Sequence, residues 1–228
     1  MIARSGLFAA ALAAVGAMAG GMGEARADII ASGVFTSDHC TGGCLTGQAN
    51  GGTVTVTDHQ NGTLDFNILL SNGNLFVGSG FDASIGFNLV GNPSITYSGI
   101  TPAAGWTIPG GPQSAGVLHM DGTGNFEYGL DVAKNGFGNN TGSSLKFSIA
   151  AQGLDINDFE VNALGQFFAA DIYSGTTGNT GAVDLSAGLK INQQCTGTCD
   201  PTVPEPASLA IFGVGLLGLG FVTAKRRK

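Results

Sequence analysis

Apolar and polar side chains alternate along most of the central part of the chain. Residues 53–57 are Thr-Val-Thr-Val-Thr, and in residues 64–70 an apolar side chain occupies every second position. The same period of two recurs at 85–89, 126–130 and 145–149. A period of two places alternate side chains on the same face of a strand. The pattern therefore predicts an all-β domain, with one helical turn near 155–159 as its only helical element.

Asn-Gly pairs mark the ends of the first strands. They occur at residues 50–51, 61–62 and 72–73, and their spacing of eleven equals a nine-residue strand plus a two-residue turn. Asn-Gly is the preferred pair for type I′ hairpin turns because both central positions need a positive φ. The spacing predicts a meander of neighbouring strands over residues 52–80.

The remaining segments complete an antiparallel arrangement. The segment 98–116 is rich in Gly and contains three prolines, which predicts a long loop. About ten short strands separated by Gly, Asn, Ser and Thr are typical of an antiparallel β-sandwich, with a jelly-roll order as one version of it. Besides the meander, strands are expected near 29–35, 82–90, 116–120, 124–132, 144–151 and 165–173.

The N-terminal segment has the features of a secretory signal peptide, which we place at residues 1–27. Arg4 precedes an uncharged run of 13 residues, 7–19, and the segment ends in Ala25-Arg26-Ala27. Such a run is too short to span about 30 Å of hydrocarbon, and the small residues at its end suit signal peptidase. Cleavage would leave Asp28 as the first residue.

The C-terminal segment has three elements in a fixed order. Pro204, Glu205 and Pro206 are followed by eighteen uncharged residues, 207–224, which predict one transmembrane helix. Four cations end the chain. They favour a cytoplasmic C-terminus and place the preceding domain outside the inner membrane. This topology anchor consists of Lys225, Arg226, Arg227 and Lys228.

The string Val203-Pro204-Glu205-Pro206-Ala207-Ser208, the Gly/Leu-rich span and the basic end together resemble the bacterial PEP-CTERM sorting signal, over residues 204–228. The resemblance implies a Gram-negative bacterium, Sec export, a transient anchor in the inner membrane and an exosortase as the processing enzyme. It also implies an association with exopolysaccharide and biofilm at the cell surface or in the extracellular matrix. Residues 28–203 are then the β-sandwich ectodomain.

Three strings within this ectodomain resemble a recurrent group of PEP-CTERM ectodomains that has no established activity. They are residues 38–44, residues 121–126, and residues 170–173 together with 178–181.

The ectodomain is strongly acidic. It holds 14 of the 16 acidic residues and only three lysines, so its net charge is 3 − 14 = −11. Nucleic-acid binding needs a basic face, which excludes a nucleic-acid partner for the domain as a whole. The charge favours cations or neutral partners.

The four cysteines form two copies of one motif, Cys40 with Cys44 and Cys195 with Cys199. In an exported chain an even number of cysteines predicts disulfides. Loop entropy favours a bridge between the motifs, about 5 kcal/mol against about 2 kcal/mol for each local loop. The short spacing and the glycines within it favour local pairs. A four-cysteine zinc site is a weaker alternative in an oxidising compartment.

Two groups of side chains could offer oxygen ligands to Ca²⁺. Neither matches an EF-hand loop, and Asx side chains in turns usually cap their own backbone, so we expect no bound metal and no cofactor. The first group is Asp121, Asn125 and Glu127, and the second is Asp155, Asn157 and Asp158.

Other candidates for ligand contact are aromatic residues and a threonine ladder. Trp106, with Tyr97 and Tyr173, could form a platform for a sugar ring. Thr53, Thr55 and Thr57 could form part of an ice-binding plane, although the next strand offers only Thr63.

No catalytic motif stands out. The chain has no G-x-S-x-G and no H-E-x-x-H motif, and its histidines, at positions 39, 59 and 119, are far apart in the sequence. The sequence therefore predicts an exported, non-enzymatic surface or matrix protein. The alternatives are a carbohydrate-binding module and, with less support, a secreted hydrolase or an ice-binding protein.

Overall fold

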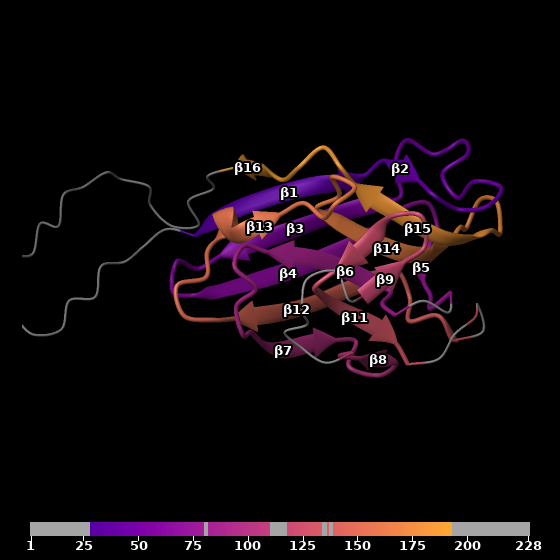
Figure 1. Cartoon of the computed structure of the whole chain (residues 1–228). Coiled ribbons are helices and arrows are strands. Elements are labelled where there is room, and N and C mark those ends of the chain that lie inside the picture. Colours follow the sequence, from indigo (N-terminus) through magenta and orange to yellow (C-terminus); the bar gives the residue numbers. More distant parts are fainter. Residues whose placement is uncertain (1–27, 80–81, 110–117, 134–135, 137–138, 193–228) are drawn as a thin grey trace, which may run out of the picture. The chain divides into compact units, whose positions relative to one another are not determined.

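Two antiparallel β-sheets pack face to face in the computed structural model (Figure 1). The structure describes residues 28–79, 82–109, 118–133, 136 and 139–192. The predicted signal peptide, the predicted transmembrane helix, Cys195 and Cys199 lie outside these residues. No helix within the described part has the length and hydrophobicity that crossing a membrane requires.

The first sheet has six strands. In spatial order they are β16 (Lys190–Asn192), β1 (Ile29–Phe35), β3 (Gly52–Asp58), β4 (Thr63–Leu70), β12 (Ser144–Ala150) and β7 (Thr96–Thr101).

The second sheet follows the order β2 (Ser37–Asp38), β15 (Thr180–Leu185), β14 (Phe168–Tyr173), β6 (Ile85–Leu89), β11 (Tyr128–Val132) and β8 (Trp106–Thr107). Two short strands join it, because β5 (Leu75–Phe76) pairs with β14 and β13 (Phe159–Glu160) pairs with β6. A separate hairpin consists of β9 (Leu118–Met120) and β10 (Gly124–Phe126).

The core between the sheets is built around phenylalanine. Phe66 of β4 stacks on Phe147 of β12, with ring centroids 4.3 Å apart, in the first sheet. Across the interface its ring lies 5.4 Å from Phe87 of β6 and 6.2 Å from Phe168 of β14. The alternation seen in the sequence supplies these inward positions, as in β3, where every second residue is buried. The predicted antiparallel, sandwich-like arrangement is confirmed, whereas the jelly-roll order stays a prediction.

The β9–β10 hairpin covers the outer face of the second sheet. Met120 and Phe126 of the hairpin are buried against it in a small second core. This close approach requires glycine on the sheet, because a Cβ at Gly86 would lie 2.6 Å from the Phe126 ring and 2.8 Å from the Met120 sulfur. The hairpin therefore forms a partial third layer.

The meander prediction is right for one hairpin and wrong beyond it. β3 and β4 are adjacent and antiparallel, as expected. The Asn72-Gly73 pair does adopt the predicted turn, with φ of 58° and 75° and a hydrogen bond from Asn74 N to Ser71 O of 2.9 Å. However, this turn leads to β5, which pairs with β14 in the other sheet. A local turn signal does not specify which sheet receives the next strand.

Other differences come from strands without alternation. The predicted loop 98–116 contains the end of β7 and all of β8, although 110–117 lie outside the described residues. The sequence also gave no signal for β15, in which five of six residues are buried. A strand covered on both faces has no polar side to alternate with. The helical turn is confirmed as a 3₁₀ helix, η2 (Ile156–Asp158).

The two ends of the described chain lie side by side. β1 and β16 are antiparallel neighbours, with Ile30 opposite Asn192. From there β1 runs for seven residues to Phe35, roughly 23 Å at about 3.3 Å per residue. One end of the sandwich therefore holds both chain ends, and the opposite end holds the loop that follows β2.

A histidine clasp secures the start of β1. His59, after β3, lies between two carboxylates, with Nδ1 3.0 Å from Asp28 Oδ1 and Nε2 2.9 Å from Asp65 Oδ2. The hydrogen bond to Asp65 is the main cause that raises the pKa of His59. Burial lowers the pKa of His59, and the hydrogen bond to Asp28 raises it further. The protonated form of His59 therefore stabilises the fold.

We expect Gly86→Ala to destabilise the domain by about 1–3 kcal/mol, because the new methyl group would overlap the Phe126 ring. Urea unfolding measures the effect. Ser32→Ala is the matched control, since Ser32 is half-buried on the outer side of the first sheet, and its expected change is below about 0.5 kcal/mol. Equal midpoints for the two variants would contradict the close packing of the hairpin.

The clasp predicts a pH dependence of stability. The pKa of His59 is raised in the folded state. The contribution of His59 to the free energy of unfolding is therefore complete below the unfolded pKa of about 6.5, and it is lost as the pH rises through the folded pKa. About a third of the ring is exposed, so the expected loss is below about 1 kcal/mol. Unfolding of wild type and His59→Gln should differ less at high pH than at about pH 6. A difference that grows with pH would contradict the clasp.

Candidate functional site

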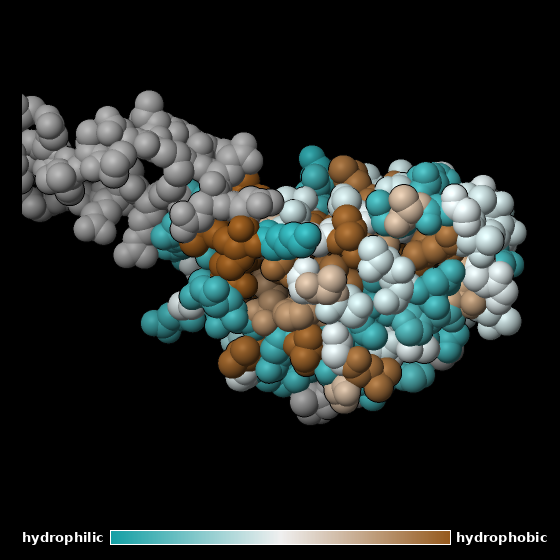
Figure 2. Space-filling model, turned by 90° about the horizontal axis from the view of Figure 1, so that it is seen from above, coloured by the Kyte–Doolittle hydropathy of each residue, from teal (hydrophilic) through white to brown (hydrophobic). Residues whose placement is uncertain are grey.

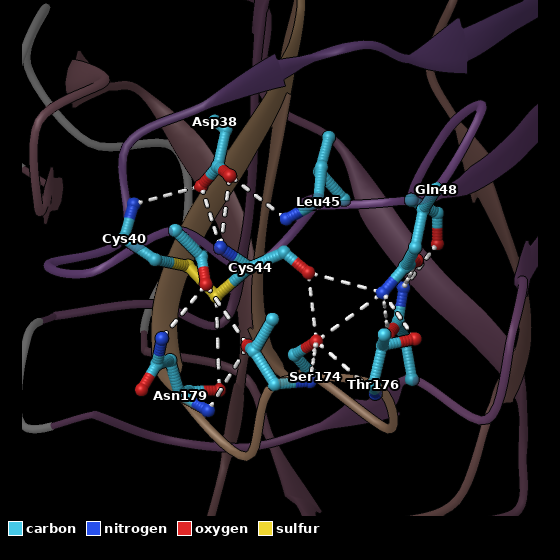
Figure 3. The surroundings of a disulfide bond; sticks show 12 residues. Asp38, Cys40, Cys44, Leu45, Gln48, Ser174, Thr176 and Asn179 are labelled. Carbon is cyan, nitrogen blue, oxygen red and sulfur yellow. Dashed lines mark hydrogen bonds between the residues drawn. A yellow bond between two sulfur atoms is a disulfide. The ribbon is translucent and has the colours of Figure 1, made fainter.

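Three loop segments that are distant in the sequence meet at the end of the sandwich opposite to the chain ends. They are residues 38–51, residues 71–74 and residues 174–181, and we call this assembly the tip (Figure 3). In the view from above, the right-hand end of the molecule is coloured mainly white and teal (Figure 2). The tip was not predicted as a unit, because no pattern in the sequence links its segments.

A disulfide closes the first segment. Cys40 is bonded to Cys44, with their Cα atoms 5.5 Å apart. Local pairing is therefore confirmed for this motif, and a bridge from it to the second motif is excluded. Cys44 is fully buried, and Gly181 lies beneath Cys40, where a Cβ would approach the Cys40 Cα to 2.9 Å. The disulfide loop thus packs directly on the start of β15.

The carboxylate of Asp38 organises the backbone of this loop. It accepts hydrogen bonds from the N–H groups of Cys40 (3.1 Å), Cys44 (2.8 Å) and Leu45 (2.8 Å). Burial raises the pKa of Asp38, but these N–H groups outweigh burial and lower the pKa below its ordinary value. Asp38 therefore stays ionised and acts as a structural acceptor.

Asp38, Cys40 and Cys44 are also the one group with the spacing of metal ligands within the described part of the chain. This donor set does not suit a metal ion, because the two sulfurs are bonded to each other and the carboxylate already accepts three N–H groups.

Neutral polar side chains join the disulfide loop to the other two segments. Cys44 O accepts hydrogen bonds from Ser174 Oγ (2.7 Å) and Gln48 Nε2 (3.0 Å). Gln48 Oε1 in turn accepts from Asn74 Nδ2 (2.9 Å). Nearby, Gly43 O accepts from Asn179 Nδ2 (2.8 Å). Each donor satisfies a carbonyl that has no strand partner, so the network gives the tip one defined conformation.

A buried carboxylate holds His39 within the tip. His39 Nε2 lies 2.5 Å from Asp184 Oδ2 of β15, and Asp184 is fully buried. Burial raises the pKa of Asp184, and the hydrogen bond to His39 opposes this rise. The imidazole also lies against the β9–β10 turn, where a Cβ at Gly122 would come within 2.7 Å of the His39 Cβ. The structure thus brings together parts of the three strings that the sequence singled out.

Asp171, from the third string, lies buried in β14. Its Oδ2 accepts a hydrogen bond from Ser79 N of 2.6 Å, and Oδ1 has no partner. The pKa of Asp171 is raised to about 6, and burial is the main cause. The hydrogen bonds from Ser79 oppose this rise, and the charges of Asp121 and Asp131 add to it. The outer side of the second sheet therefore carries closely spaced acidic groups.

The calcium candidates have separate surroundings. Asn125 is exposed, with Oδ1 2.8 Å from His119 Nδ1, whereas Glu127 is buried. Burial, and next to it the charge of Glu160, raises the pKa of Glu127. In the second group, Asp155 and Asp158 form a capping box around η2, as expected for Asx side chains in turns.

The aromatic platform is not formed. Trp106 is only 8% exposed and its ring packs edge-on against Phe76 at 5.4 Å, so a sugar ring cannot stack on it. The prediction of Trp106 as a ligand contact is wrong because the short strand β8 turns this side chain into the core. Tyr97 packs against the same core, while Tyr173 is half-buried at the end of β14.

The threonine ladder lies on the outer face of the first sheet. Thr53, Thr55 and Thr57 are half-buried there. Their neighbours across β1 and β4 are not threonines, so the ladder is not repeated on either side. The neighbours are Val34, Ser32, Ile30, Leu69, Asn67 and Asp65.

The disulfide of the tip leads to a prediction for the second motif. Because Cys40 and Cys44 are bonded to each other, we expect Cys195 and Cys199 to form a second local bridge. Mass spectrometry of peptides prepared without reduction should find each motif closed on itself. The Cys195→Ser/Cys199→Ser variant serves as the control and should leave the Cys40–Cys44 loop intact. A peptide that links position 40 or 44 to the second motif would contradict the structure.

The comparison with protein families locates the sorting signal. Residues 202–227 match the PEP-CTERM protein-sorting motif, which contains Pro204, Glu205, Pro206 and the apolar segment 207–224. No curated protein and no solved structure matches the chain. The motif is that of an exported precursor, anchored in the membrane before an exosortase sorts it. The chain therefore carries a PEP-CTERM sorting motif, as exosortase substrates do, behind an all-β, sandwich-like domain.

Proposed function

We propose that the mature chain is a non-enzymatic protein of the cell surface or the extracellular matrix. Its tail holds it at the periplasmic side of the inner membrane until exosortase cleavage releases it into an exopolysaccharide or biofilm matrix. The observation that carries the proposal is the placement of the chain ends and the tip at opposite ends of the ectodomain.

The pairing of β1 with β16 supports this arrangement. The predicted signal peptide precedes Asp28, and the predicted tail lies beyond Asn192. β1 begins directly after Asp28, and β16, its neighbour at the edge of the first sheet, ends at Asn192. A precursor can therefore hold both apolar segments in one membrane without unfolding the sheet. Because the tip lies at the far end of β1, it points away from both attachments.

The hydrogen bonds of the reactive side chains also support a structural role. His39 and His59 bind carboxylates, and Asp38 accepts three backbone N–H groups. A hollow of about 300 Å³ near η2 is lined by Asp58 and Asp155, and two acidic residues are what a glycosidase site requires. Both oxygens of Asp58 accept backbone N–H groups, from Gln60 and Ile156, so this aspartate acts as a cap.

A carbohydrate-binding module is the second candidate, and the two roles are compatible in a matrix protein. What favours it is the outer face of the first sheet, which is open and carries hydroxyl and amide side chains. The capping role of Asp58 and the single threonine ladder give no support to a hydrolase or to an ice-binding protein.

Processing of the tail provides the test. In cells with the exosortase, mass spectrometry of the mature protein should show a chain that begins at Asp28 and lacks the four basic residues at the end. In cells without the exosortase, the chain should remain in the membrane with its tail. Replacing Pro204, Glu205 and Pro206 by alanine should have the same effect, whereas the control Arg227→Lys should be processed normally. A tail that is intact through Lys228 in both strains would disprove release by cleavage.

A further inference from the structure

The outer faces of the two sheets differ in how they are covered. The β9–β10 hairpin packs on the second sheet, whereas the outward side chains of the first sheet stay half-buried or exposed. Leu69, at the end of β4, is 44% exposed. The first sheet therefore presents an open surface, which we call the open face and define by the outward residues of β16, β1, β3, β4, β12 and β7.

Charge is divided between the two sides of the sandwich. Both lysines within the described residues, Lys146 and Lys190, project from the open face, together with the one aspartate Asp65. The second sheet and the segments joined to it carry eight acidic residues and no lysine or arginine among the described positions. These acids are Asp38, Asp82, Asp121, Glu127, Asp131, Glu160, Asp171 and Asp184.

The separation of the faces decides what an approaching polymer meets. Two packed sheets are about 10 Å apart, and side chains on their outer faces are farther apart still. At physiological salt the Debye length is about 8 Å, so charges on one outer face are largely screened from a ligand on the other. The acidic side of the domain therefore does not prevent an anionic chain from binding to the open face.

A β-bulge forms a hollow in this face. Gly99 of β7, with φ of 64°, lies where the register between β7 and β12 shifts. The hollow beside it has a volume of about 250 Å³, and its polar lining comes from Thr57, Asp65, Asn67, Lys146 and Ser148. Bulges are common next to binding sites because they interrupt the regular surface of a sheet.

Two groups in the hollow are not used by the protein. Lys146 makes no salt bridge with any described residue. Asn67 stands directly opposite Lys146 in the register of β4 and β12. Its Oδ1 is buried, and its side-chain amide forms no hydrogen bond with a described residue. An ammonium group next to an amide N–H donor is complementary to a sugar unit that carries a carboxylate and hydroxyl groups.

We propose that the open face, centred on the hollow at Lys146 and Asn67, binds an acidic polysaccharide through its uronate carboxylates and hydroxyl groups. This inference rests on the proposed matrix function and names the class of ligand for it. Lys146 pairs with a carboxylate, Asn67 donates a hydrogen bond from Nδ2 to a hydroxyl oxygen, and the hydroxyl group of Thr57 extends the contact along the chain.

Binding is tested with the full chain purified in detergent, with polygalacturonate as the probe and its fully methyl-esterified form as the neutral comparison. We expect polygalacturonate to bind about tenfold more tightly than the ester, and the difference to shrink as salt is added. Lys146→Glu should weaken the binding of polygalacturonate about tenfold, while Asn67→Ala should weaken the binding of both polymers.

The matched control makes the same change in net charge as Lys146→Glu, but at positions outside the hollow. The Gln152→Glu/Ala187→Asp variant also adds two negative charges at exposed positions, and it should bind polygalacturonate like the wild type. An equal loss in this control and in Lys146→Glu would show that total charge governs binding and would overturn the proposal.

Two further outcomes would overturn it. One is a wild-type chain that binds neither polymer. The other is a chain that ignores polygalacturonate but binds phosphatidylglycerol micelles in a way that depends on Lys146, since the face would then recognise a lipid. Because binding is measured in vitro, its failure leaves tail processing unaffected, and a failure of processing in cells leaves the binding result standing.

Discussion

The packing of the two sheets through the phenylalanine cluster is the interaction on which the rest of the structure depends. Phe66, Phe87, Phe147 and Phe168 occupy inward positions of four strands from both sheets, and their rings are in mutual contact. Because this core uses one side of each strand, the opposite sides remain free to take on different roles. The second sheet uses its outer side to hold a hairpin, which requires Gly86, while the first sheet leaves its outer side open. The same packing brings β2, β14 and β15 to the end of the sandwich where the tip forms.

The tip shows how an exported domain can fix long loops with few apolar residues. One disulfide closes the loop that follows β2, one carboxylate collects three of its N–H groups, and amide and hydroxyl side chains connect it to two other turns. A disulfide of this kind is maintained in oxidising compartments, in agreement with the sorting motif at the other end of the chain. A hydrogen-bonded tip and a lysine-bearing open face give the domain two distinct surfaces.

The fold could be predicted where the signal was local. β1 has the predicted limits, and β3, β4 and β12 follow their alternation closely, because in these strands one face is buried and the other is open. Prediction failed where both faces of a strand are covered, as in β15, or where a turn leads into the other sheet, as at Asn72-Gly73. Trp106 was assigned to a loop because its surroundings are rich in Gly and Pro. The two-residue strand β8 is too short to produce a pattern, yet it turns the ring inward.

By itself, the sequence determined the all-β class of the domain and its sorting motif, because strand periodicity and a PEP-CTERM motif are both written in consecutive residues. It also placed most of the acids in the ectodomain. Only the tertiary structure decided that Cys40 pairs with Cys44, that Gln48 meets Ser174 from 126 positions away, and that the described lysines share a face apart from most of the acids. These features depend on which strands become neighbours. That choice is made by the packing of the whole core, which no short stretch of the chain encodes.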